Sequence, residues 1–174
     1  LMIVYVFSYP NYSFTQVMMS FVSVVYVAVM LGCIYQVRAL SHGGILVALV
    51  FFSAWGNDTC AYCVGVLFGK HKMSPKLSPK KSVEGLIGGI VGATLIGAAY
   101  GAIMKQYMTV TYNPIILFAV VCGVGGFISV VGDLSASAIK RQYGIKDYGN
   151  LIPGHGGIMD RFDSIIFTAP IVYY

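Results

Sequence analysis

The feature that most constrains this chain is the recurrence of apolar runs about as long as a lipid bilayer is thick. A transmembrane helix needs about 20 predominantly apolar residues, and the first such run covers residues 14–37. Of the 174 residues, 57% are hydrophobic and 10% are charged, whereas soluble domains are about 25% charged. The sequence therefore predicts an all-α fold, a polytopic transmembrane helical bundle with about five to six membrane segments.

The apolar runs predict five membrane segments, at about residues 14–37, 43–68, 85–104, 114–131 and 160–174. Residues 1–9 are apolar but too short to span a bilayer. We interpret them as the tail of a further helix, so that the chain is expected to be a fragment that lacks N-terminal helices. We expect residues 1–174 to form a single integral-membrane domain.

Basic residues are concentrated in two segments, 70–84 and 133–161. The first segment holds Lys70, Lys72, Lys76, Lys80 and Lys81, and the second holds Lys140, Arg141, Lys146 and Arg161. Two predicted spans separate the segments, so both lie on one side of the membrane, which the positive-inside rule identifies as the cytoplasm. We expect a basic cytoplasmic loop at 70–84 and a cytoplasmic catalytic segment at 133–161.

Asp58 lies inside the apolar segment 43–68, where a charge is costly and usually faces a partner or a water-filled cavity. Asn57 adjoins it, and Gly56 permits a break in the helix. These neighbours favour a functional site. The alternative is a structural hydrogen bond to a neighbouring helix.

Asp133, Ser137, Lys140 and Arg141 follow the i, i+4, i+7, i+8 spacing that lines one face of a helix. An acid, a hydroxyl and two cations on one face suit a phosphate or a metal–phosphate site. The alternative, which the spacing favours equally, is a solvated helix end whose charged residues form ion pairs along the helix.

The stretch IPGHGGIMDRFD, residues 152–163, gathers three glycines, His155 and Arg161 around two acids. Asp160 and Asp163 share a helix face if a helix begins near residue 159. Paired carboxylates suit Mg²⁺, which prefers oxygen ligands, and glycine-rich turns before a helix present N–H groups to anions. An ordinary helix cap explains Asp160 alone but leaves the rest of the group unexplained.

Two further motifs each allow two interpretations. The lysine-rich segment 70–84 is either a topology signal attracted to anionic headgroups or a mobile basic lid over a polyphosphate. Cys60 and Cys63 have the CxxC spacing of redox and zinc motifs. Without a second such pair, buried free cysteines are the favoured interpretation.

Three blocks, SAIKR at 137–141, KD at 146–147 and IPGHGGIMDRFD at 152–163, together resemble the signature of phosphatidate cytidylyltransferases, also called CDP-diacylglycerol synthases. WGNDTCAYCVGVLFGKHK and SPKKSVEGLIGG, within residues 55–89, also resemble that family. The resemblance covers about residues 55–164. One departure is Ala136, which stands where the family often has glutamate.

The resemblance implies that CTP and phosphatidate react to give CDP-diacylglycerol and pyrophosphate, with Mg²⁺ alone or with a second cation. It also implies that the protein contacts membrane lipids, binds no nucleic acid and lies in a bacterial inner membrane. A homodimer is compatible with the resemblance. Spacing and resemblance together assign catalysis to Asp133, Lys140, Arg141, Lys146, Asp147, His155, Asp160 and Arg161, substrate binding to Asn57, Asp58, Lys80, Lys81, Ser137, Gly156 and Gly157, and metal binding to Asp133, Asp160 and Asp163.

Three alternatives remain open at this point. A CTP-dependent lipid kinase would use the same kinds of residue, and so would a cytidylyltransferase for another lipid phosphate. A transporter would need charges along a path between the two membrane faces. Only Asp58 lies deep among the predicted spans, which makes transport the weakest of the three.

Overall fold

The computed structural model describes residues 1–75, 77–108, 112–149 and 157–174. Within these residues, four helical stretches are long and apolar enough to cross a membrane: Phe14–Ala39, Gly43–Phe68, Val83–Tyr107 and Pro114–Gln142. They agree with the first four predicted segments, and the predicted all-α membrane bundle is confirmed. The fifth predicted segment is a shorter helix that begins at Met159, one residue from the predicted start.

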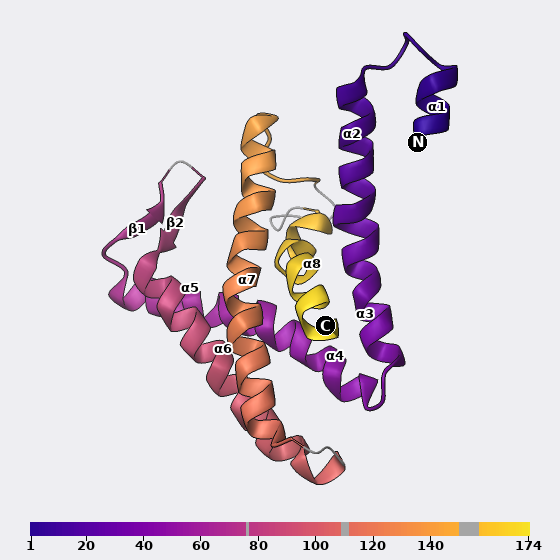
Figure 1. Cartoon of the computed structure of the whole chain (residues 1–174). Coiled ribbons are helices and arrows are strands. Elements are labelled where there is room, and N and C mark those ends of the chain that lie inside the picture. The colour runs from indigo at the N-terminus through magenta and orange to yellow at the C-terminus, as the bar shows by residue number, and fades with distance from the viewer. Residues whose placement is uncertain (76, 109–111, 150–156) are drawn as a thin grey trace.

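The elements follow one another along the chain as Figure 1 labels them. The helices are α1 (Met2–Phe7), α2 (Phe14–Ser23), α3 (Met30–Ala39), α4 (Gly43–Phe51), α5 (Asn57–Phe68), α6 (Val83–Met104), α7 (Pro114–Gln142) and α8 (Met159–Tyr173), and a hairpin is formed by β1 (Lys72–Ser74) and β2 (Ser78–Ser82). π-helical turns, Val24–Val29 and Phe52–Gly56, join α2 to α3 and α4 to α5, and a 3-10 turn, Lys105–Tyr107, extends α6.

Two features were not predicted, the hairpin and the π-helical turn, whereas the length of α7 agrees with the spacing of its polar residues. The basic loop contains the antiparallel β1–β2 hairpin, which projects beside α5 and α6 in Figure 1. α7 continues beyond its apolar part to Gln142, as the helical spacing of Asp133, Ser137 and Lys140 indicated. The helix is not broken at Gly56 but widens into the π-helical turn that Asn57 follows.

Local sequence explains where the helices begin. Ser13 and Gln16 form a reciprocal capping box at the start of α2. Ser82 ends β2 and caps α6 by accepting a hydrogen bond from the N–H of Gly85. Asn113 caps α7, whose first residue is proline, the residue best tolerated there because that N–H has no helical partner.

Small residues allow α6 to pack closely against α5 and α7. Its buried positions, Gly85, Gly89, Ala93, Gly97 and Gly101, recur every four residues and so form one face. A Cβ atom added at Gly97 would lie 2.4 Å from the carbonyl oxygen of Phe118 in α7. Close approach of this kind is a common way for membrane helices to associate.

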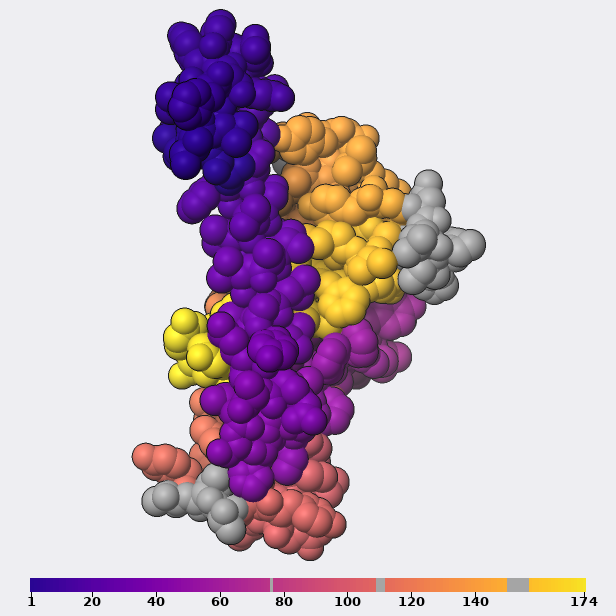
Figure 2. All heavy atoms as spheres, turned by 90° about the vertical axis from the view of Figure 1, so that its right-hand side faces the viewer, coloured from indigo at the N-terminus to yellow at the C-terminus, as the bar shows by residue number. Residues whose placement is uncertain are grey.

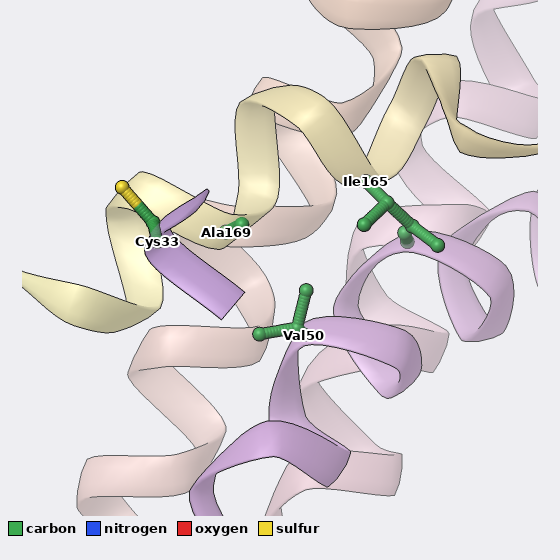
Figure 3. Packing of buried hydrophobic residues seen from close by; sticks show 5 residues of the cluster. Cys33, Val50, Ile165 and Ala169 are labelled. Atoms are coloured by element: carbon green, nitrogen blue, oxygen red, sulfur yellow. The ribbon is translucent and has the colours of Figure 1, made fainter. Parts of the chain in front are cut away.

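α8 is held inside the bundle by an apolar cluster that joins it to α3, α4 and the following π-helical turn. Figure 3 shows Cys33, Val50, Ile165 and Ala169 of this cluster, which also includes Ala54. Ile165, Ala169 and Val50 are fully buried. This packing holds α8, the helix that carries Asp160 and Asp163, against α3 and α4.

Candidate active site

A pocket of about 520 Å³ lies where the hairpin connects α5 to α6. Five predicted site residues line it: Asn57, Asp58, Lys80, Lys81 and Asp133. The rest of its wall is mainly apolar and includes Tyr62, Val66 and Leu86. Residues that the sequence placed in three separate segments are therefore brought to one pocket with both charged and apolar walls.

Asp133 projects from α7 and forms an ion pair with Lys81 of β2. One turn further along α7, the hydroxyl of Ser137 donates a hydrogen bond to Asp133 Oδ1 at 3.4 Å. The two side chains of the ion pair are 24% and 25% exposed, so competing ions from water can reach the pair. The basic hairpin thus reaches the carboxylate that was predicted to bind metal.

The hydroxyl of Ser164, in α8, lies between two further carboxylates. Ser164 Oγ is 3.1 Å from Asp58 Oδ2 and 3.3 Å from Asp163 Oδ1, and its proton can be donated to either. Asp163 is buried and also accepts a hydrogen bond from the N–H of Ser164 at 2.7 Å. α5 and α8 therefore bring Asp58 and Asp163 together around one hydroxyl.

Asp160 accepts hydrogen bonds from three donors. Lys140 Nζ lies 2.8 Å from Oδ1, and the N–H groups of Tyr148 and Gly157 lie 2.8 Å and 3.0 Å from Oδ2. Burial alone would raise the pKa of Asp160, but the hydrogen bonds from Lys140 and the two amides outweigh it and lower the pKa. Metal binding by Asp160 stays a prediction, and here its carboxylate ties the end of α7 to the start of α8.

Asn57, which was predicted to bind substrate, lies deep in the bundle. Its side chain is fully buried and donates from Nδ2 to Ser129 Oγ of α7 at 3.1 Å. Lys80, by contrast, is exposed on β2 at the rim of the same pocket.

The remaining predicted catalytic cations and Asp147 lie on the surface at the end of α7 and the start of α8. Exposed residues in this group are Arg141, Lys146, Asp147 and Arg161. The backbone carbonyl of Arg161 accepts a 3.5 Å hydrogen bond from Trp55 Nε1. His155 and Gly156 lie outside the residues that the structure describes, so their assignments stay predictions.

The carboxylates of the pocket fit a metal ion that is shared with a substrate. Among the described residues, no three His, Cys, Asp or Glu side chains converge closely enough to hold an ion by themselves. Mg²⁺ in proteins is usually held by one or two carboxylates together with water and substrate phosphates. Asp58 and Asp133 supply two carboxylates to one pocket, and the ammonium of Lys81 already lies against Asp133. The donor set thus fits Mg²⁺.

Sequence reasoning missed three residues that organise the site: Ser129, Tyr148 and Ser164. Ser164 had a usable signal, because it follows Asp163 and shares a helix face with Asp160 at the i, i+4 spacing. Ser129 and Tyr148 had none, since their partners lie 72 residues away in α5 and 12 residues away in α8.

Two sequence peculiarities have structural explanations. Ala136 is fully buried in α7, and its carbonyl accepts a hydrogen bond from the hydroxyl of Tyr148 at 3.2 Å. Cys60 packs against Gly92, where an added Cβ would lie 2.4 Å from the cysteine sulfur. This contact agrees with the interpretation of Cys60 as a packed free cysteine, whereas Cys63 is free but exposed, so the interpretation as buried is wrong for Cys63.

A sequence model described as "Cytidylyltransferase family" matches residues 1–174. A phosphatidate cytidylyltransferase of Staphylococcus epidermidis is 38% identical over 167 residues, which cover 96% of this chain and 62% of that protein. The protein of the same name from Bacillus subtilis (strain 168) is 34% identical over 167 residues, 94% of this chain and 60% of the relative. The chain therefore spans less than two thirds of the length of these curated relatives.

Proposed function

This chain belongs to the cytidylyltransferase family, and we propose on that premise that it transfers the cytidylyl group of CTP to phosphatidate. The products are CDP-diacylglycerol and pyrophosphate. The names of the relatives support this reaction. So does one observation in particular: Asp58, Asp133, Lys80 and Lys81 line a single pocket whose remaining wall is mainly apolar.

The reaction is an in-line displacement in which a phosphate oxygen of phosphatidate attacks the α-phosphorus of CTP and pyrophosphate leaves. Both reactants carry several negative charges, so the protein must mainly position them and neutralise charge. Asp133 and Asp58, with Asp163 beside them, would hold Mg²⁺, which neutralises charge on the triphosphate when bound. A second cation stays part of the proposal.

The cations of the site have separate roles in this proposal. Lys80, exposed at the rim, attracts the incoming phosphates. Lys81 lies deeper and can turn from Asp133 to a phosphate oxygen. Lys140 is held by Asp160 and orders the segment after α7, while Arg141, Lys146 and Arg161 present positive charge on the surface nearby.

The apolar wall suits the lipid substrate. Tyr62 and Val66 line the pocket and are 72% and 67% exposed on the outer face of α5. Figure 2 shows, on another face, that α2 extends beyond the rest of the bundle, and its residues Phe14, Phe21 and Val22 are exposed. We place the pocket on the cytoplasmic side of a bacterial inner membrane, because the basic segments face the cytoplasm by the positive-inside rule. Homodimer formation is kept as a prediction.

The proposal is tested with the protein in lipid vesicles that contain phosphatidate, supplied with Mg²⁺ and CTP labelled in its α-phosphate. Formation of labelled CDP-lipid with release of pyrophosphate supports it. Phosphorylated lipid together with CDP would instead support a lipid kinase, and movement of a solute without CDP-lipid would support a transporter.

Single substitutions test whether this pocket is the active site. Asp133→Asn should abolish turnover, because it removes the carboxylate proposed to bind metal, while Lys105→Gln, outside the pocket and at the far end of α6, should leave turnover unchanged. Full activity in Asp133→Asn would overturn the assignment of this pocket.

A further inference from the structure

We infer that Asn57 is a positioning residue, whose buried amide fixes α5 against α6 and α7 so that Asp58 faces the pocket. The inference rests on the proposed function for its catalytic consequence, but the geometry it describes can be tested without any turnover. It replaces the expectation that Asn57 binds substrate directly.

The amide of Asn57 is enclosed by two neighbouring helices. Its side chain has no exposed surface, and its Nδ2 donates to Ser129 Oγ at 3.1 Å. Ser129 is fully buried as well and donates its own proton to the carbonyl oxygen of Gly126 at 2.8 Å. A continuous chain of hydrogen bonds therefore runs from α5 to the backbone of α7.

The two neighbouring helices leave room for this amide only because they carry glycine opposite it. A Cβ at Gly89 of α6 would lie 2.6 Å from Asn57 Oδ1 and 2.9 Å from its backbone oxygen. A Cβ at Gly126 of α7 would lie 3.3 Å from the same Oδ1. The amide is thus fitted between two glycines.

The cost of this arrangement argues that it serves more than packing. Among the described residues, Asn57 Oδ1 has no hydrogen-bond partner, and a buried polar atom without a partner is unfavourable. An apolar side chain of similar size would avoid that cost. What the amide provides is direction, because a hydrogen bond to Ser129 sets the rotation of α5 about its axis.

That rotation matters because of what lies on either side of Asn57. The π-helical turn Phe52–Gly56 ends immediately before it, and such turns change the angular phase of a helix and are frequent at functional sites. Asp58 follows it, lines the pocket and accepts the hydrogen bond from Ser164. The Asn57–Ser129 contact therefore sets the phase of α5 at the point where Asp58 must be aimed.

The first experiment measures the direction of residue 58 without turnover. Asp58→Cys is labelled with a charged maleimide, and peptide mass spectrometry reports this site separately from the four native cysteines. Adding Ser129→Ala should slow labelling at position 58 at least threefold, because α5 loses its fixed rotation. Labelling of Lys105→Cys, outside the pocket, should not change and reports that the protein is still folded.

The second experiment uses kinetics on the otherwise unmodified protein. Ser129→Ala should lower kcat about tenfold or more, as loss of a supporting contact commonly does, and leave the KM for CTP unchanged. Asn57→Ala should have the same effect, and the double variant should lower kcat no further than either single variant does. Ser129→Thr keeps the hydroxyl and should recover most of the activity.

Unchanged labelling at position 58 in the Ser129→Ala variant would overturn the inference. So would a KM for CTP or phosphatidate that rises in Asn57→Ala but not in Ser129→Ala, because Asn57 would then contact substrate itself. If the unmodified protein makes no CDP-lipid, the proposed function fails, but the labelling experiment still decides the role of Asn57.

Discussion

Replacing Asp160 by asparagine should loosen the segment that follows α7 without unfolding the helices. The carboxylate receives the N–H groups of Tyr148 and Gly157 on one oxygen and the ammonium of Lys140 on the other. Asparagine keeps the shape of the side chain but removes its charge, and its NH₂ group faces one of these donors. The change therefore tests the charge of Asp160 rather than its volume.

The expected size of the effect follows from these contacts. A hydrogen bond to a charged group contributes about 1.5–3 kcal/mol, and one between neutral groups about 0.5–1.5 kcal/mol. Each of the two amide bonds should therefore weaken by about 1–1.5 kcal/mol. Since about 1.4 kcal/mol corresponds to a tenfold change in an equilibrium constant, exchange of these two amide hydrogens should accelerate about 5- to 12-fold.

Hydrogen–deuterium exchange with single-residue resolution measures this directly. Asp147→Asn is the matched control, because it removes the same charge from an exposed position one residue before Tyr148. Adding Lys140→Met to Asp160→Asn should recover part of any loss in thermal stability, because the lone ammonium, whose side chain is only 12% exposed, is then no longer buried without a partner. Equal acceleration in Asp147→Asn, or none in Asp160→Asn, would refute the reasoning.

Three further predictions use the same physical logic. Lys81→Gln should strengthen the binding of Mn²⁺ several-fold, because it removes the ammonium that competes for the carboxylate of Asp133. Mn²⁺ serves as a probe for Mg²⁺, and its binding is followed by electron paramagnetic resonance. Lys80→Gln is the control and should have a smaller effect. Gly97→Ala should lower the free energy of unfolding by about 1–3 kcal/mol, since its Cβ would meet the backbone of α7, whereas Gly32→Ala, with nothing within 4 Å of the added atom, should not; thermal unfolding in detergent compares the two. The pKa of Asp160 is lowered in the folded protein, so its contribution to stability is complete above its unfolded value of about 3.9 and should be lost as the pH falls through the lowered value. The protection of its partner amides, taken relative to their intrinsic exchange rate at each pH, should therefore stay constant from neutral pH to about pH 4.5.

The sequence predicted what depends on spacing along one helix. The apolar runs located four spans, and the i, i+4 relation of Asp133 and Ser137 is present in α7 as a hydrogen bond. The sequence could not show which donors the side chain of Asp160 would meet, since Lys140 lies 20 residues earlier on a different helix. Pairings of that kind depend on how helices are placed side by side.

The hairpin shows a second limit of sequence reasoning. Lysines and two Ser-Pro pairs indicated only a basic loop, because its strands are short and carry no alternating apolar pattern. The structure nevertheless pairs these strands, and the pairing brings Lys81 to Asp133. Lys81 and Asp133 had each been assigned to the site, but neither their ion pair nor the hairpin that brings them together was predicted.

The layout of the pocket wall also has a consequence for how the protein is made. All of its lining residues except Val130 and Asp133 come from the continuous stretch 57–86. Contacts between neighbours in sequence form sooner than distant ones, because less chain must be ordered to close them. During synthesis, α5, the hairpin and α6 can therefore assemble as one unit. α7 packs against this unit afterwards, so the nascent pocket lacks Asp133 until α7 is in place.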